Sequence, residues 1–280
     1  MKSRSRLRMT NRSKSQIKRK SHKVSMNGYG MTDKGIRRTN NQDSILVDND
    51  LMLYIVADGM GGHAKGEIAS REAVNAIHDF MKKNIVPDLI DRAGDDSTIM
   101  SLVSMSIQEA HRNIYGQSGD EIMGTTLTFL LFRDEKVILA HVGDSRAYRI
   151  RGGTTEKLTK DHTQAQNLVD LGMITDLEAE NHRLSHALTR AVGAREAVKP
   201  DISIFDVGDS DIFLLSSDGL FRVLNVDVAS KILMNSISAK DKCEALIKET
   251  IEGGAPDNVS VIVVEAKKRS LMRRILRKRK

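Results

Sequence analysis

The sequence predicts a layered α+β fold, in which antiparallel sheets and helices form separate layers. Strand-like runs of β-branched and aromatic residues outnumber the helical segments. Most of them follow one another through short polar turns that suit hairpins rather than crossover helices. Helical periodicity is confined to about residues 67–85, 97–115 and 226–251, apart from a polar insert. A chain of 280 residues with 40% hydrophobic residues is long enough to bury one large core.

The N-terminal half begins with two strands joined by a polar loop, within residues 26–48. The next strand is the apolar run of residues 51–57, which has no polar interruption and is therefore expected to be buried on both faces. We expect this strand to end at Asp58, because the glycine-rich stretch DGMGG follows it. Two amphipathic helices, at residues 67–85 and 97–115, then form one antiparallel layer.

The C-terminal half contains further strands and a long insert. The runs MGTTLTFLLF and KVILAHVGDSRAYRI predict three strands, the last two meeting at the tight turn VGDSR. A polar, helix-prone insert occupies about residues 161–195. It is followed by the strand DIFLLSSDG, helices within residues 226–251, the loop GGAPDN and a last strand, VSVIVVEA.

The net charge of +7 conceals segments of opposite sign. Residues 1–23 hold ten Lys or Arg and residues 267–280 hold nine, with no acidic residue in either segment. The body between them holds 25 Lys or Arg against 37 Asp or Glu and is therefore acidic. Basic ends of this kind are usually solvated tails; the alternative is contact with an anionic membrane, nucleic acid or an acidic partner. The C-terminal tail suits a membrane surface better, because a helix would carry four apolar residues on one face: Leu271, Met272, Ile275 and Leu276.

Two other features bear on the location of the protein. No apolar run approaches the roughly 18 residues needed to span a bilayer, and the basic N-terminus is not followed by an apolar signal sequence. We therefore expect a cytoplasmic protein that the C-terminal tail could bring to a membrane surface. Cys243 is the only cysteine, so the chain can form neither an internal disulfide nor a thiolate-rich metal site. We expect Cys243 to be a small apolar residue within a helix.

Four aspartates share one local pattern, a strand end beside glycine or asparagine. Asp58 follows LMLYIVA, Asp144 follows VILAHVG, Asp218 follows IFLLSS, and Asp257 precedes NVSVIVV. If these strands form one pair of packed sheets, the carboxylates converge on one cleft and repel one another unless cations lie between them. Oxygen ligands without cysteine or paired histidine favour Mg²⁺ or Mn²⁺. Two such ions suit the attack of an activated water on a phosphoryl group.

Eight short motifs occur in the order and approximate spacing of one enzyme family. They are RRTNNQD, ADGMGGHAKGE, MGTT, GDSR, LTKDHT, LTRAVG, LLSSDGL and GGAPDN. Any one of them arises often by chance, but all eight in order are highly specific. On these motifs the chain, over about residues 26–266, resembles the metal-dependent protein phosphatases of type 2C (the PPM family) in their bacterial form.

The resemblance implies a four-layer α–β–β–α sandwich with two central antiparallel sheets and a flap at residues 161–195. It implies a phosphatase domain at residues 26–266, between basic tails at residues 1–25 and 267–280. The implied reaction is hydrolysis of phosphoserine and phosphothreonine in proteins by a water that bridges two metal ions. The cofactors would be two Mn²⁺ or Mg²⁺ ions with a weaker third, and the partners phosphorylated proteins and a cognate Ser/Thr kinase. We expect a monomer.

The resemblance also assigns metal ligands at the positions that match the motifs. Asp58 would bridge both metals, and the backbone carbonyl of Gly59 would contact the second. Asp218 and Asp257 would complete the ligands of the first metal, with water in the remaining positions. Asp144 would bind the third, more weakly held metal; its alternative role is to cap a tight hairpin turn.

Three further residues have roles around these ligands. Arg38 resembles the arginine that grips the substrate phosphate, for which a planar guanidinium is better suited than an ammonium group. Its neighbour Arg37 is expected to be a solvated surface charge. Asp43 and Asn258 would lie behind the ligands, where Asp43 would orient a metal-bound water.

Three positions depart from the family's pattern. Gln42 stands where many members have Glu, so we expect weaker rather than absent metal binding. Met60 stands where eukaryotic members have a histidine that acts as general acid. His63 is not expected to inherit that role, and water would protonate the leaving group. Arg222 replaces a further aspartate of the eukaryotic family, which weakens the expected third metal site.

Other polar residues receive plainer interpretations. The histidines of the insert (His162, His182 and His186) match no ligand spacing and are expected at the surface or as caps. Thr125 and Thr126 are expected to satisfy backbone groups in a strand rather than to act as nucleophiles.

Two other functions remain open at this point. A catalytically silent phosphatase-like binding module would be expected to have lost at least one of Asp58, Asp218 and Asp257, but all three are present. A protein whose main activity is to bind an anionic surface through its tails would lose that activity when the tails are deleted.

Overall fold

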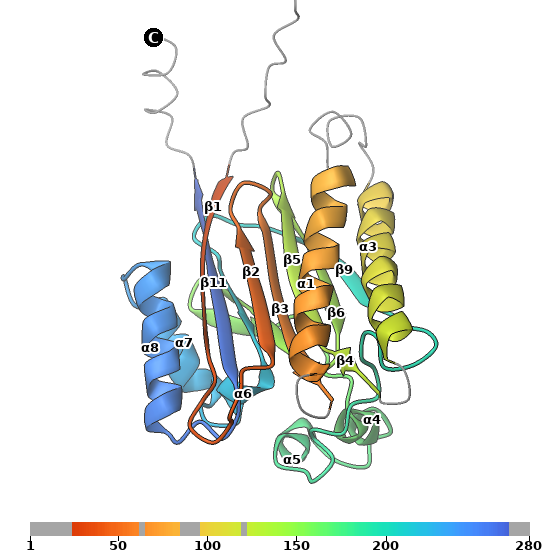
Figure 1. The fold of residues 1–280 in the computed structure, drawn as a ribbon. Helices are drawn as coiled ribbons and strands as arrows, with labels where there is room; N and C mark the ends of the chain where they lie inside the picture. The colour runs from red at the N-terminus through yellow and green to blue at the C-terminus, as the bar shows by residue number, and fades with distance from the viewer. Residues whose placement is uncertain (1–23, 62–64, 85–95, 119–121, 269–280) are drawn as a thin grey trace, which may run out of the picture.

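Two antiparallel sheets lie face to face between two layers of helices in the computed structural model (Figure 1). The structure describes residues 24–61, 65–84, 96–118 and 122–268. The expected α+β class and the four-layer α–β–β–α arrangement are confirmed. The predictions for most of both basic tails and for His63 concern positions outside the described residues.

The first sheet joins the two ends of the described chain. In spatial order its strands are β1 (Val24–Asp33), β11 (Val259–Lys268), β10 (Ile212–Ser216), β7 (Arg146–Arg151) and β8 (Thr154–Lys157). All neighbours are antiparallel. β1 and β11 pair along their whole length, from Val24 opposite Lys268 to Asp33 opposite Val259.

The second sheet contains the buried strand that the sequence predicts. In spatial order its strands are β2 (Asp43–Asp48), β3 (Leu53–Met60), β5 (Leu127–Arg133), β6 (Lys136–Val142) and β9 (Asp201–Asp206). The first five residues of β3, from Leu53 to Ala57, are fully buried. The prediction that this strand ends at Asp58 is wrong, because Gly59 and Met60 pair with the short strand β4 (Gly124–Thr125).

Large side chains from facing strands fill the space between the sheets. The rings of Tyr54, Phe132 and Phe213 pack edge to face, with successive centroids 5.7 and 5.1 Å apart. Gly28 makes room for this cluster, since a Cβ atom there would lie 2.1 Å from Cε1 of Tyr54. The Tyr54 hydroxyl donates a hydrogen bond to Oδ1 of Asn49 at 2.8 Å, so this buried polar group is satisfied.

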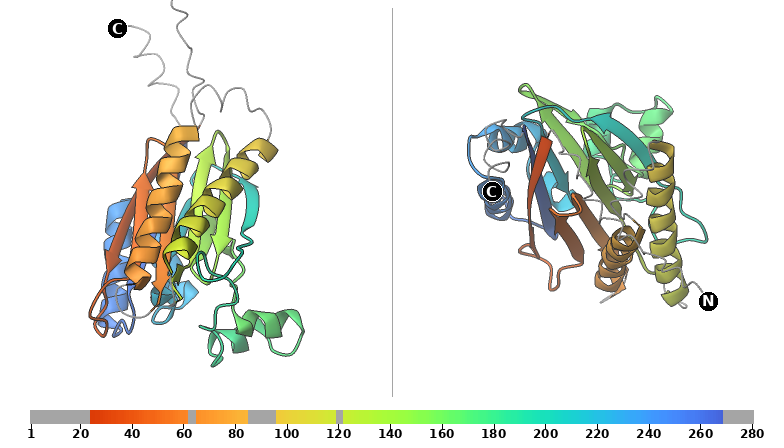
Figure 2. Two further views of the ribbon diagram at one scale, coloured as in Figure 1. Left: turned by 45° about the vertical axis from the view of Figure 1, so that its right-hand side comes forward. Right: turned by 90° about the horizontal axis from the view of Figure 1, so that it is seen from above.

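Helices cover both outer faces of the sandwich (Figure 2). α1 (Lys65–Asn84) and α3 (Asp96–Gln117) pack on the second sheet and agree with the two predicted helices to within two residues. α7 (Val226–Met234) and α8 (Ala239–Glu252) pack on the first sheet. Cys243 is buried within α8, as expected.

The insert lies at one end of the sandwich, beside β4 and the short helix α6 (Asp218–Phe221) (Figures 1 and 2). It contains α4 (Gln164–Asp170) and α5 (Asp176–Glu180). Both helices are capped locally: the side chain of Thr163 accepts from the backbone N–H of Gln166, and Thr175 forms a capping box with Glu178. The expected helix-prone, polar insert is therefore confirmed.

Two strands were not predicted, and both lie at sheet edges. β8 closes one edge of the first sheet and β9 one edge of the second. Their sequences, TTEK and DISIFD, have no fully buried residue. An edge strand with charged residues lacks the continuous apolar run that marks a central strand. Its own sequence therefore does not predict it, and it forms by pairing with the neighbouring strand.

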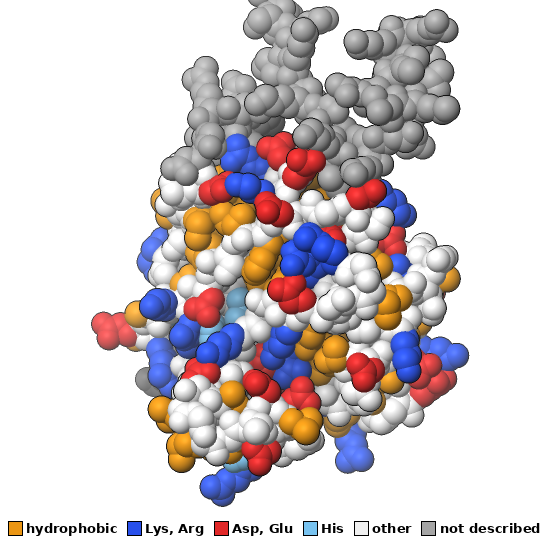
Figure 3. All heavy atoms as spheres, turned by 180° about the vertical axis from the view of Figure 1, so that it is seen from behind, with side chains coloured by type: hydrophobic (Ala, Val, Ile, Leu, Met, Phe, Trp, Pro, Cys, Tyr) orange, Lys and Arg blue, Asp and Glu red, His pale blue; other side chains and the backbone are white. Residues whose placement is uncertain are grey.

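The described surface carries both signs of charge. On the face shown in Figure 3, Lys and Arg side chains alternate with Asp and Glu, with apolar side chains between them. No helix within the described ranges is long and apolar enough to cross a membrane.

Candidate active site

Five aspartates gather at the end of the sandwich that the insert covers. Asp43 and Asp58 lie directly opposite each other, at the start of β2 and near the end of β3. The Asp58 carboxyl interacts electrostatically with the four other carboxyls, those of Asp43, Asp144, Asp218 and Asp257. The structure therefore brings together the four strand-end aspartates and adds Asp43 from the edge strand.

The backbone of Asp58 is held from both sides by neighbouring threonines. The carbonyl oxygen of Asp58 accepts hydrogen bonds from the backbone N–H of Thr126 at 2.8 Å and from Oγ1 of Thr125 at 2.9 Å. The Asp58 N–H donates to Oγ1 of Thr126 at 2.9 Å. The expectation that the two threonines satisfy backbone groups is confirmed. Because these bonds continue the sheet past Asp58, the carboxylate stands on a rigid strand rather than on a loop.

Gly59 is required by close packing. A Cβ atom at this position would lie 1.9 Å from the carbonyl oxygen of Gly66 and 2.7 Å from that of Gln42. Neither neighbour is the movable end of a side chain, so no other residue fits without displacing the backbone. The contact of its carbonyl with a metal stays a prediction.

The carboxyl groups are costly to ionise in the absence of cations. Burial raises the pKa of Asp43 to about 7, and the charges of Asp218 and Asp257 add to this effect. Burial and neighbouring carboxylates also raise the pKa values of Asp58 and Asp144 well above the usual range. A folded arrangement that concentrates negative charge in this way is expected of a site that binds cations.

Two oxygen atoms in this cluster lack any hydrogen-bond partner. Oδ1 of Asp43 and Oδ1 of Asp218 are both buried and unpaired. Buried acceptors without partners are rare in native proteins and are often explained by an ion or a water molecule. Asp58, Asp218 and Asp257 offer only oxygen donors, as Mn²⁺ and Mg²⁺ prefer. The residues present therefore fit a pair of such ions.

Two arginines engage the aspartates. Nε and an Nη of Arg38 bind the two carboxylate oxygens of Asp257, each at 2.8 Å. Arg222 donates to Oδ2 of Asp218 from Nε at 2.9 Å and from an Nη at 2.6 Å. Burial would raise the pKa of Asp218, but His186 and Arg222 together hold it below its usual value. Arg38 thus lies at the site, as the sequence predicts, and its planar guanidinium group already binds a carboxylate.

Asp43 and Asn258 hold the loops behind these ligands. Oδ2 of Asp43 accepts hydrogen bonds from Oγ of Ser217 at 2.8 Å and of Ser260 at 2.6 Å. The side chain of Asn258 accepts from the backbone N–H of Gln42 and donates to two backbone carbonyls, those of Lys34 and Asn40. These bonds join the start of β2 to the start of β11. They therefore fix the position of Asp43 relative to that of Asp257.

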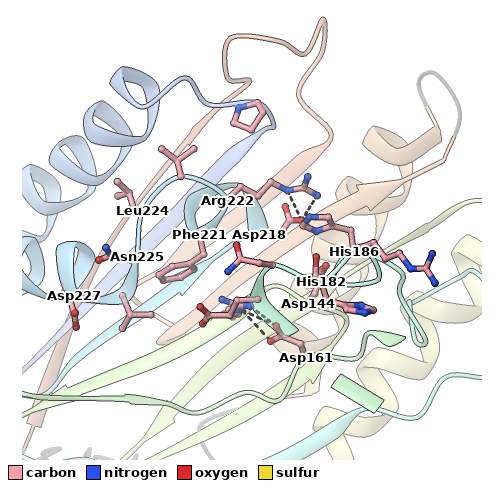
Figure 4. A pocket seen from close by; sticks show the side chains of 18 residues that line it. Asp144, Asp161, His182, His186, Asp218, Phe221, Arg222, Leu224, Asn225 and Asp227 are labelled. Carbon is pink, nitrogen blue, oxygen red and sulfur yellow. Dashed lines mark hydrogen bonds and ion pairs between the residues drawn. The ribbon is translucent and has the colours of Figure 1, made fainter. Parts of the chain in front are cut away.

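A cleft of about 790 Å³ runs from the aspartates between the insert and the segment that connects α6 with α7 (Figure 4). Asp144, His186, Asp218 and Arg222 line its inner end. The start of the insert is anchored to β7, because Arg146 binds the Asp161 carboxylate through two nitrogens at 2.7 and 3.0 Å. The insert therefore forms one wall of the cleft that leads to the candidate metal ligands.

The structure corrects one histidine prediction, that for His162, and adds a contact to His186. His162 is buried: its Nδ1 accepts from the backbone N–H of Gly143, and its Nε2 contacts Asp201. It therefore supports the turn that carries Asp144. His186 is exposed, as expected, but it also lies at the aspartate cluster, with Nδ1 3.4 Å from Oδ2 of Asp218. No local signal marks His186, because its contact with Asp218 arises only when the insert folds over the cleft.

Residues 34–261 match the family model described as protein phosphatase 2C. The chain belongs to the protein phosphatase 2C family. The family that the eight motifs predict is confirmed.

Bacterial members of the protein phosphatase 2C family are similar over most of this chain. Over 243 residues it is 35% identical to the serine/threonine protein phosphatase PstP of Mycobacterium tuberculosis, a match that covers 84% of this chain and 44% of PstP. It is 33% identical over 240 residues to the protein phosphatase PhpP of Streptococcus pneumoniae, covering 84% and 95% of the two chains. The chain thus spans less than half the length of PstP but nearly all of PhpP.

Solved structures of the 2C family share the fold. The catalytic domain of PstP in complex with two manganese ions has a TM-score of 0.75 and 31% identity, covering 88% of this chain and all of that one. The serine/threonine phosphatase of S. agalactiae has a TM-score of 0.76 and 35% identity, covering 85% and 98% of the two chains.

Proposed function

We propose that this chain hydrolyses phosphoserine and phosphothreonine in proteins, using two Mn²⁺ or Mg²⁺ ions. The observation that carries the proposal is the convergence of buried carboxylates, two of them with unpaired oxygens, beside two arginines at the end of a cleft. The two manganese ions in the related PstP structure support the choice of cofactor.

The three central aspartates would hold the ions. Asp58 would lie between both, Asp218 and Asp257 would bind the first, and the carbonyl of Gly59 would contact the second. When bound, the ions supply Lewis acidity and an activated water for in-line attack on the phosphorus. Asp144 would bind a third ion. The rigid strand pairing of Asp58 means that its carboxylate needs little rearrangement to receive them.

Arg38 would bind the substrate phosphate. It is attached to Asp257 through the same bidentate geometry that a guanidinium forms with a phosphate. Its side chain is 48% exposed, so it can turn from Asp257 to an incoming anion once that carboxylate binds a cation. Asp43, fixed by two serine hydroxyls, would orient water beside the ions.

The organisation around the site gives further proposals. The catalytic domain would span residues 26–266, with basic tails on either side; the sheet itself extends to Val24 and Lys268. These two residues pair at the end of the sandwich opposite the insert, so the described part of the chain begins and ends far from the cleft (Figure 1). The tails would be solvated, with contact to an anionic surface as the alternative, and the enzyme would act as a cytoplasmic monomer that opposes a Ser/Thr kinase.

The experiment is turnover of p-nitrophenyl phosphate and of a phosphothreonine peptide by metal-stripped protein, titrated with Mn²⁺ and Mg²⁺. We expect metal-dependent hydrolysis of both, and a loss of at least about 100-fold in Asp58→Asn, which removes charge that two ions would share. Binding of Mn²⁺ without turnover would favour a silent binding module instead.

The basic ends can be tested separately. Removal of residues 1–23 and 269–280 leaves every described residue in place. We expect this shortened protein to keep its turnover of p-nitrophenyl phosphate. Loss of its main activity would favour the anionic-surface binder.

A further inference from the structure

His186 brings a nitrogen donor to the aspartate cluster. One potential ligand atom from each of Asp144, His186 and Asp218 lies within 4.8 Å of the other two. The three come from different elements, the β6–β7 turn, the insert and the first residue of α6, and they point toward one another at the inner end of the cleft (Figure 4).

The two carboxylates of this group have unsatisfied oxygens. Asp144 is only 8% exposed, and among the described residues no hydrogen bond or ion pair holds its carboxylate, although the charges of Arg146 and Arg222 act on it. Oδ1 of Asp218 is buried and unpaired, whereas Oδ2 receives Arg222 and His186. A carboxylate that is buried without a partner needs a cation or a proton. Since His186 is half exposed, it can adjust to complete a site.

We propose that His186 is a ligand of a third divalent cation, held together with Asp144 and Asp218. The proposal rests on the proposed two-ion function at one point: Asp218 would bind the first ion with one carboxylate oxygen and the third ion with the other. Water would fill the remaining positions. The aspartate that Arg222 replaces is then not needed, because the insert supplies the missing ligand.

The chemistry of the donors determines which ions such a site accepts. Imidazole nitrogen suits transition metals such as Zn²⁺, Fe²⁺ or Ni²⁺, whereas Mg²⁺ prefers oxygen ligands only. The third site therefore selects transition metals more strongly than the two-ion site, whose protein donors are oxygens. Because His186 belongs to the insert, occupancy of this site also fixes the insert over the cleft.

Arg222 competes with the third ion. Its guanidinium binds the same carboxylate at 2.6 Å and also lies 3.5 Å from Asp257. A bound ion must share or displace this tethered positive charge. Substitution of Arg222 should therefore strengthen ion binding at the third site, whereas substitution of His186 should weaken it.

The test counts and characterises bound Mn²⁺ in the full-length protein. Titration followed by the electron paramagnetic resonance signal of free Mn²⁺ should find three bound ions. Pulsed measurements on the saturated protein should detect a directly bound ¹⁴N nucleus. His186→Ala should abolish the ¹⁴N coupling and weaken the third site by at least about tenfold, while two ions remain bound. Arg222→Ala should strengthen the third site several-fold.

The matched control is His182→Asn in the same insert. His182 also lines the cleft, but its Nδ1 accepts from the backbone N–H of Leu184, a bond that asparagine can replace. This variant should keep three ions and the ¹⁴N coupling. Two ions in the wild type, or three ions without ¹⁴N coupling, would overturn the assignment of His186. The wild-type measurement needs no variant to fold. Failure of the proposed function would look different, as metal binding without turnover.

Discussion

Asp43→Asn should stabilise the metal-free protein at neutral and alkaline pH. Asp43 is 7% exposed, its Oδ1 has no partner, and burial raises its pKa from 3.8 to about 7. A shift of about three units at roughly 1.4 kcal/mol each makes ionisation of this group cost up to about 4 kcal/mol. Asparagine keeps an oxygen acceptor for Ser217 and Ser260 but carries no charge. Because a buried amide has its own desolvation cost, we expect a net gain of about 1–3 kcal/mol.

The pH dependence gives the sign of the effect. A carboxyl group whose pKa is higher in the folded than in the unfolded protein destabilises the fold as the pH rises above the unfolded value. For Asp43 this loss develops between about pH 4 and pH 7. The free energy of unfolding of Asp43→Asn should therefore exceed that of the wild type most at pH 8, and the difference should shrink as the pH falls towards 4.

Urea unfolding in the presence of a chelator, at several pH values, measures this difference. The control is Asp79→Asn on the exposed side of α1, which should change the free energy of unfolding by less than about 0.5 kcal/mol. With saturating Mn²⁺ the wild type should be more stable than Asp43→Asn, because only the wild type gains the full stabilisation from bound ions. A metal-free Asp43→Asn that is less stable than the wild type at pH 8, or a difference that does not vary with pH, would refute the reasoning.

Three other predictions concern separate features. Arg38→Ala should raise the KM for a phosphothreonine peptide at least about tenfold with a smaller change in kcat, and an unchanged KM would remove Arg38 from the phosphate site. Lys242→Met should cost about 1–3 kcal/mol in urea unfolding, since it removes the buried partner of Glu265 at 2.7 Å and leaves only the exposed Lys267. Lys267→Met, which removes that exposed contact to the same carboxylate, should cost less than about 1 kcal/mol. Burial lowers the pKa of His141 to about 3, so the folded protein does not bind a proton that the unfolded chain takes up below about pH 6.5. The wild type therefore loses stability as the pH falls from 7 to 5, and the amount by which His141→Gln is less stable than the wild type should become smaller. A difference that stays constant over this range would contradict the prediction.

Local sequence patterns located the central part of the site. The uninterrupted apolar run before Asp58 predicts a strand buried on both faces, and the carboxylate at its end must then stand at the edge of the core. The same reasoning found Asp218 and Asp257. It failed at the end of the strand, where pairing with β4 carries the sheet past Asp58 to Met60. That pairing joins residues far apart in the chain, which no local pattern records.

The sequence did not predict the positions of His186 and Arg222 for the same reason, whereas Arg38 was predicted through the family motif. His186 has no ligand spacing, and Arg222 marks only a missing aspartate. Their contacts with Asp218 depend on how the insert and α6 lie across the end of the sandwich. The sequence by itself determined the layered fold, the family and the strand-end carboxylates, because periodicity, turns and motif order are properties of short segments. Only the tertiary structure decided that His186 and Arg222 meet those carboxylates, because their contacts depend on elements that the chain brings together from a distance.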